Sequence, residues 1–168
     1  LFVGLESELM PKVTVKGLTE TVKMLEKIES NTDDIIESSL IKGGAKVTDI
    51  MRSEINQLKT SDDYQPGDSK RYPRPEDKKG LQEALGYTPV QMKGSKFDIN
   101  TGFDGYNSHI TKKYPKGHAN QMIANAINKG TSFLQAQPFI NRTRSKARNA
   151  AVEEMQKELD KGIKKLTR

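Results

Sequence analysis

Hydrophobic residues recur at helical spacing through the last part of the chain. They fall three, four or seven positions apart, at Ile140, Ala147, Ala151, Met155, Leu159, Ile163 and Leu166. Positions with this spacing share one face of a 3.6-residue helix, so a single amphipathic helix is predicted over residues 138–168. Pro138 suits its start because the ring fixes a helical φ and the missing N–H is not needed there. Asn141 is the predicted N-cap.

Two more helices are predicted near the start of the chain. Leu18, Val22, Leu25 and Ile28 share one side of the first helix. A longer helix follows from a cap at Asn31 or Thr32. Its stripe of small and apolar residues comprises Ile36, Leu40, Gly44, Val47, Met51, Ile55 and Leu58.

Gly43 and Gly44 lie in the middle of this longer helix, followed by Ala45. Each glycine costs about 1 kcal/mol relative to alanine at such a position. The three small residues therefore predict either a kink or the close approach of another backbone.

Short strands are predicted in two places. Residues 13–16 alternate apolar and polar side chains and end at Gly17. In the centre, one strand is predicted through Tyr87, Val90 and Met92, and another over residues 96–103. Residues 93–95 suit the turn of a hairpin between them.

A helical turn is predicted at Ala84 and Leu85, and a short helix over residues 119–127 that is closed by Gly130. Strands limited to two places, with helices around them, predict an α+β fold. Its expected order is a short N-terminal strand, two helices of which the second is long, a central β-hairpin or small antiparallel sheet, a short helix and a long C-terminal amphipathic helix.

Residues 59–79 lack any apolar pattern and contain Pro66, Pro73 and Pro75. With so few aliphatic side chains, the segment cannot offset the conformational entropy that ordering would cost. We predict either a mobile, solvated loop or an arm that becomes ordered on a partner. In the second case the contacting side chains would be Tyr64, Arg71, Tyr72 and Arg74.

The composition predicts a small core. Hydrophobic residues make up 33% of the 168 positions, charged residues make up 30%, and there is no tryptophan. Such a chain is expected to bury part of its surface between subunits. We predict a single domain over residues 10–168, in which Met10 is the natural start and residues 1–9 are an upstream or added extension.

Candidate chemistry is sparse. There is no cysteine, and His109 and His118 have no carboxylate at ligand spacing, so neither a thiolate nor a zinc site is predicted. Asp98 and Asp104 are too far apart along a strand to act as an acid and base pair. No apolar run approaches the roughly 18 residues that a membrane span needs. We therefore expect a soluble protein that is not an enzyme and uses no cofactor or metal.

Charge is distributed unevenly along the chain. Residues 1–58 carry a net charge of −3, whereas residues 138–168 carry +5. Four cations crowd the first turns of the predicted C-terminal helix, where the helix dipole disfavours them: Arg142, Arg144, Lys146 and Arg148. An acidic neighbour, in this chain or in another, would explain this order.

Three interpretations of these four cations remain open at this point. They form a solvated helix face, they contact Asp33, Asp34 and Glu37 of a neighbouring subunit, or they contact the phosphates of DNA. Both kinds of contact would relieve the repulsion between like charges four residues apart on one helix.

A resemblance to a known family rests on residues in the second half of the chain. They are the run Gly102-Phe103-Asp104-Gly105-Tyr106, the segment 120–127, the triplet Gly130-Thr131-Ser132 and the turn Gln137-Pro138-Phe139-Ile140 before a long basic-then-acidic helix. This order resembles the siphophage head–tail joining proteins, also described as tail-completion or neck proteins and named after gene product ten of a lambda-like coliphage. Arg142 and Thr143 depart from the family, in which proline and alanine often follow the Pro-Phe turn.

The resemblance implies a structural phage or prophage protein that acts without catalysis. Such proteins form a ring, commonly a hexamer, in the virion neck, after a period in the host cytoplasm during assembly. The implied partners are copies of itself, the portal or connector, and tail-tube or tail-terminator proteins, with passing contact to double-stranded DNA. Gly130, Pro138 and Phe139 would form the structural turn, and the basic cluster would face the next subunit or the channel. The alternatives are a basic DNA-binding protein and a transient phage assembly chaperone.

Overall fold

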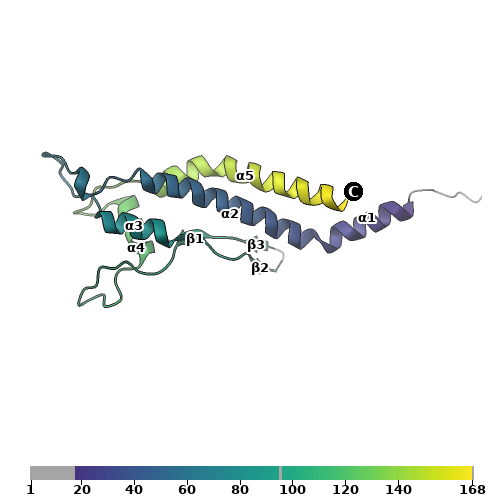
Figure 1. Ribbon diagram of the computed structural model, residues 1–168, viewed down its shortest axis with the longest axis horizontal. Coiled ribbons are helices and arrows are strands. Elements are labelled where there is room, and N and C mark those ends of the chain that lie inside the picture. The colour runs from purple at the N-terminus through teal and green to yellow at the C-terminus, as the bar shows by residue number, and fades with distance from the viewer. Residues whose placement is uncertain (1–17, 95, 168) are drawn as a thin grey trace, which may run out of the picture.

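The computed structural model describes residues 18–94 and 96–167. Within this range it has five α-helices and two small antiparallel sheets, so the predicted α+β class is confirmed. Figure 1 shows an elongated molecule in which two long helices run side by side. The strand predicted at residues 13–16 and the extension at residues 1–9 lie outside the described residues.

The long pair consists of α2 (Thr32–Asn56) and α5 (Phe139–Leu166), which run antiparallel (Figure 1). Helix α1 (Leu18–Ser30) precedes α2 and projects beyond the pair. The three predicted helices are therefore present. The side chains of Val22 and Leu25 on α1 remain exposed.

Glycines allow the two long helices to approach closely. A Cβ added to Gly43 of α2 would lie 2.1 Å from Met155 Cε of α5, and one added to Gly162 of α5 would lie 2.8 Å from Ile35 Cγ2. Ser39 Oγ also donates a 2.8 Å hydrogen bond to the carbonyl oxygen of Met155. Gly44 instead faces the Ile99 side chain, where an added Cβ would lie 2.8 Å from Cδ1, so the two predicted glycines make room for the side chains of Met155 and Ile99.

The two central strands are interrupted, which corrects the prediction of one continuous strand on each side. Strand β1 (Leu85–Tyr87) pairs with β4 (Thr101–Phe103), and β2 (Gln91–Lys93) pairs with β3 (Lys96–Asp98). The break falls next to Pro89, which has no N–H for a ladder hydrogen bond. Thr88 spans it, because its N–H donates to Asn100 O and its Oγ1 accepts from Asn100 N.

The hydrophobic core lies at one end of the long pair. There α3 (Pro75–Ala84) and α4 (Asn120–Lys129) pack with the last turns of α2 and the first turn of α5. Ile55, Leu81, Ile127 and Phe139 are fully buried. The ring of Phe139 meets the ring of Phe103 edge to face, with centroids 6.1 Å apart. The core thus joins α2, α3, α4, α5 and the strand pair β1–β4.

Three predicted boundaries need correction. Helix α5 begins at Phe139 with Pro138 in the N-cap position, so Asn141 lies inside the helix and is not its cap. Helix α3 begins at Pro75, since proline is favoured in a first turn, and the loop predicted over residues 59–79 therefore ends earlier. A short 3₁₀ helix, Ser61–Asp63, also lies within that loop.

Candidate interaction surfaces

Glu54 binds two of the four cations in the predicted basic cluster, Arg142 and Lys146. Its carboxylate accepts a 2.6 Å hydrogen bond from Arg142 Nε and another hydrogen bond from Lys146 Nζ. Only 1% of the Glu54 side chain is exposed. Hydrogen bonds from Arg142 and Lys146 hold the pKa of this carboxyl below its ordinary value of 4.5. The predicted acidic neighbour is therefore found within the same chain for two of the four cations.

The antiparallel packing explains why these charges oppose the dipoles of their own helices. Glu54 lies in the last turn of α2, and Arg142 in the first turn of α5, both in positions where the local dipole disfavours that charge. Because α2 and α5 run in opposite directions, the two unfavourable charges meet and neutralise each other. Local helix propensity alone would not have selected either of them.

Arg144 and Arg148 point away from Glu54. Both are exposed, and within the described residues neither has an ion-pair partner. They lie one helical turn apart on α5, so their positive charges repel each other, and a negatively charged partner would relieve this repulsion. Arg142 and Lys146 are already paired with Glu54. The predicted contact with Asp33, Asp34 and Glu37 of a neighbouring subunit therefore stays a prediction for Arg144 and Arg148 only.

The predicted turn residues hold α4, α5 and the end of α2 together. Gly130 ends α4 with a φ of +73°, and a Cβ there would lie 3.0 Å from Leu134 O. Beyond it, the side chain of Gln137 exchanges two hydrogen bonds with the backbone of Lys59. Phe139 then enters the core. Glycine at position 130 is thus required both by backbone conformation and by space.

The four side chains predicted to contact a partner from the loop do not form one group. Arg74 makes two 3.0 Å hydrogen bonds to Asp77, and Tyr72 lies half-buried beneath Lys59 Nζ. Tyr64 and Arg71 instead line a hollow of about 440 Å³ with Lys70 and Phe133, and the large apolar side chain of Phe133 is 79% exposed. Only this second pair is placed for an external contact.

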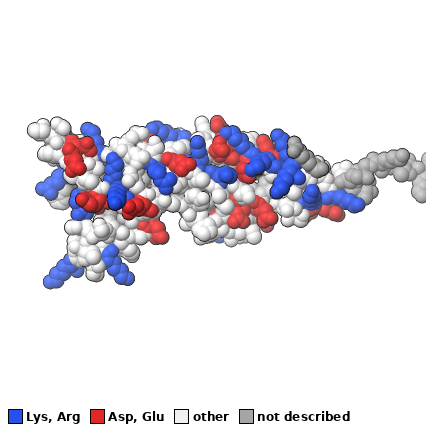
Figure 2. Space-filling model, viewed as in Figure 1, with Lys and Arg blue, Asp and Glu red and all other residues white. Residues whose placement is uncertain are grey.

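A basic projection follows the hairpin. It lies within the loop between β4 and α4 in Figure 1, over residues 105–119, which contain no aspartate or glutamate, and its outer end carries blue side chains in Figure 2. Its cations are Lys112, Lys113 and Lys116, all exposed. His109 and His118 stack with ring centroids 6.4 Å apart. Within the described residues, however, no three His, Asp or Glu side chains are placed to share a metal ion.

Asn107 fixes the base of this projection. Its Nδ2 donates to Asp77 Oδ1 at 3.0 Å, and its Oδ1 accepts from the backbone N–H of His118 at 2.8 Å. Burial raises the pKa of Asp77, but hydrogen bonds from Arg74 and Asn107 more than offset this effect, so the pKa is lowered overall. The projection is therefore tied to α3 by a carboxylate that stays charged.

An acidic hollow lies between α3 and the start of the same loop. It has a volume of about 670 Å³ and is lined by Glu76, Glu83 and Asp104, with Lys79 as its one cation. The hollow was missed from sequence because its parts come from separate segments. The spacing of Glu76, Lys79 and Glu83 on one helix face is the signal that could have indicated it.

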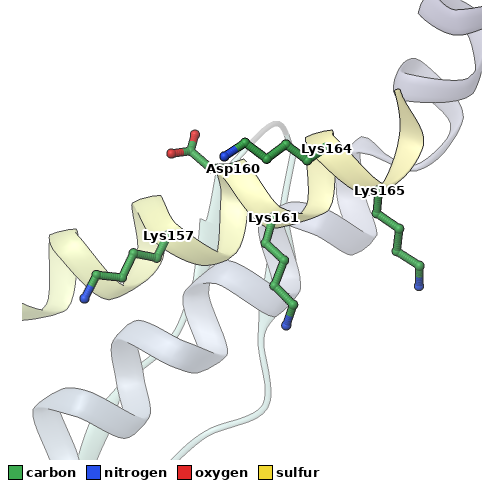
Figure 3. Close-up of a pocket in the computed structure, with 5 residues that line it drawn as sticks. All are labelled: Lys157, Asp160, Lys161, Lys164 and Lys165. Atoms are coloured by element: carbon green, nitrogen blue, oxygen red, sulfur yellow. The ribbon is translucent and has the colours of Figure 1, made fainter. Parts of the chain in front are cut away.

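A third hollow, of about 600 Å³, lies along the last turns of α5. Figure 3 shows that its four lysine side chains spread in different directions from the helix and do not converge on one point. Lys157 and Lys161 are also paired with Glu154 and Glu158 of their own helix. We therefore assign no ligand to it.

Comparison of the chain with family models, with curated proteins and with solved structures found no match. Among the described helices, none is both long and apolar enough to cross a bilayer.

Proposed function

We propose that this chain is a structural protein of a phage or prophage that forms a ring in the head–tail neck. The observation that carries the proposal is the form of the molecule: a long helix pair with a core at only one end and many side chains left for external contact. Val22 and Leu25, which share one side of α1, are both exposed, as is Phe133 between α4 and α5. A helix side with adjoining exposed apolar residues is typical of a contact between proteins.

The resemblance at residues 102–140 narrows the proposal from an assembly protein to a neck protein. Its turn residues join the loop after α2, helix α4 and helix α5 into one unit. In a ring, each subunit needs two different surfaces that fit each other. The exposed arginines of α5 and the acidic hollow beside α3 supply opposite charges for such contacts. The portal or connector and the tail-tube or tail-terminator proteins would bind the two ends of the ring, and DNA would pass through its channel.

Disruption of the gene in the phage or prophage that encodes this chain tests the proposal. We expect electron microscopy to find filled heads and separate tails, and joined particles to return when the intact gene is supplied from a plasmid. Joined particles at normal yield without the gene would contradict the proposal. Mass spectrometry of finished particles adds a second criterion, because absence of the protein from them would favour a transient assembly chaperone.

A second candidate function, DNA binding, is favoured by one observation. Residues 105–152 contain eight lysines and arginines and no aspartate or glutamate. Binding through phosphates would weaken steeply as salt rises, because each neutralised phosphate releases counterions. Weak binding that does not respond to salt would eliminate this candidate.

A further inference from the structure

The acidic hollow beside α3 has the properties of a receptor for a basic side chain. Glu76, Glu83 and Asp104 line it, and Lys79 is the only cation among its lining residues. Lys79 pairs with Glu83 at 3.9 Å, with both side chains about 70% exposed. Such an exposed pair contributes little, so Glu83 can exchange it for a better partner. The hollow therefore has negative charge in excess.

Asn120, at the inner side of the hollow, has an unused hydrogen-bond acceptor. The residue is 4% exposed, and its Oδ1 is the one buried side-chain polar atom without a partner in the described part of the chain. Its Nδ2 donates to Asp104 O at 2.8 Å, which fixes the orientation of the amide. Buried polar atoms are nearly always hydrogen-bonded, so this exception requires an explanation.

Gly80 lies beside this buried oxygen. A Cβ added to Gly80 would lie 3.7 Å from Asn120 Oδ1. Gly80 and Asn120 both line the hollow. The wall of the hollow therefore combines a buried, unpaired acceptor with carboxylates. Carboxylates that line a hollow favour a cationic hydrogen-bond donor.

Arginine fits these requirements better than a metal ion. The carboxylates of the hollow are too dispersed to share one ion, since no three acidic or histidine side chains of the described residues form a metal-binding group. A guanidinium instead carries five N–H donors in a planar fork and can bond several separate acceptors at once.

Two arginines on α5 lack such a partner among the described residues. Arg144 and Arg148 are exposed on a rigid helix, within the acid-free segment 105–152, and no carboxylate among the described residues pairs with either. Arg142 and Lys146, on the same turns, are already held by Glu54. The unpaired cations and the unfilled acidic hollow are thus complementary surfaces of one molecule.

We propose that the acidic hollow of one subunit binds Arg144 and Arg148 of a second copy of this chain. The inference rests on the proposed ring, because a contact between two different surfaces of identical subunits is the kind that closes a ring.

Paired charge reversals test the contact in solution. One variant carries Glu76→Arg and Glu83→Arg, and the other carries Arg144→Glu and Arg148→Glu. Sedimentation velocity over a range of concentrations at low salt should detect self-association of the native protein. Each variant alone should self-associate at least about tenfold more weakly than the native protein, because like charges then face each other. An equimolar mixture of the two variants should associate again, since each then offers the charge that the other needs.

The matched control carries Lys164→Glu and Lys165→Glu, which change the net charge by the same amount at the far end of α5 and should leave association unchanged. Recovery in the mixture also excludes misfolding as the cause of the loss. A native protein that stays monomeric at every concentration, variants that associate like the native protein, or a mixture that stays monomeric would each overturn the contact. Native-like association of both variants would contradict this contact but not the proposed ring. Normal head–tail joining without the gene would contradict the proposed ring itself.

Discussion

Arg142 of α5 donates a 2.6 Å hydrogen bond to Glu54 of α2 across 88 positions of sequence. Lys146 donates to the other oxygen of the same carboxylate. The two cations keep part of their side chains in solvent, at 39% and 57% exposure, while Glu54 is almost completely buried. The stability of the helix pair near the core therefore depends on the charge of Glu54 more than on either cation.

Replacing Glu54 with glutamine should lower the free energy of unfolding by about 2 kcal/mol, since charge-assisted hydrogen bonds are lost and two cations remain side by side. Urea denaturation monitored by circular dichroism measures this change. Glu153→Gln is the matched control, because Glu153 is exposed on the same helix pair and should change stability by less than about 0.5 kcal/mol. Equal effects of both substitutions would contradict the central role of Glu54.

The contribution of Glu54 should also depend on pH. Its folded-state pKa is lower than the ordinary value of 4.5, so the unfolded chain takes up the proton first as pH falls. The stabilisation is therefore complete above about pH 4.5 and is lost as pH falls through the lower, folded-state pKa. The stability difference between native protein and Glu54→Gln should be constant near neutrality and shrink in acid. If this stability difference grew as the pH fell, folding would not lower the pKa of Glu54.

Gly43→Val should destabilise the protein by about 1–3 kcal/mol, because the new side chain would overlap Met155, including Cγ near its base, and would force that side chain out of its packed position. Lys42→Val is the control, since it places the same β-branched residue at the adjacent, exposed position of α2. Thermal unfolding of both variants measures the difference. If Gly43→Val were no worse than Lys42→Val, the close packing at Gly43 would be refuted.

Asn107→Ala should loosen the basic projection. The substitution removes the hydrogen bond to Asp77 and leaves the backbone N–H of His118 unpaired, at a cost of roughly 1–3 kcal/mol. Trypsin should then cleave faster after Lys112, Lys113 and Lys116, which limited proteolysis with mass spectrometry can follow. Ser108→Ala, at the neighbouring exposed position, should leave the cleavage rate unchanged. Unchanged cleavage in Asn107→Ala would mean that this residue does not hold the projection.

Gly130→Ala should cost roughly 1–3 kcal/mol, since an alanine must adopt a φ of +73° and its Cβ would lie 3.0 Å from backbone atoms of the following turn. Gly86→Ala, where nothing lies within 4 Å and no positive φ is required, should have a much smaller effect. Urea midpoints of the two variants make the comparison. Similar midpoints would argue against a structural role for Gly130.

Long periodic patterns were predicted well from sequence. The apolar stripes of α2 and α5 extend over many turns, so their helices could be placed to within a few residues. Short elements were predicted less well. The strand boundaries depend on Pro89 and Thr88, and the start of α3 depends on Pro75, where a single residue outweighs the pattern around it. The charged face of α3 could have been read from the spacing of Glu76, Lys79 and Glu83, but the hollow itself could not, because α3 and the loop after β4 meet only in the folded chain.

The sequence by itself determined the α+β class, the long helices, the turn at Gly130 and the excess of cations at the start of α5, since these follow from local periodicity, backbone preference and charge order. Only the tertiary structure decided what each cation does. Antiparallel packing brings Glu54 to Arg142 and Lys146 and leaves Arg144 and Arg148 in solvent, because residues on one helix turn face different directions. Which charges find a partner is a property of the packing between distant segments, and no local pattern contains it.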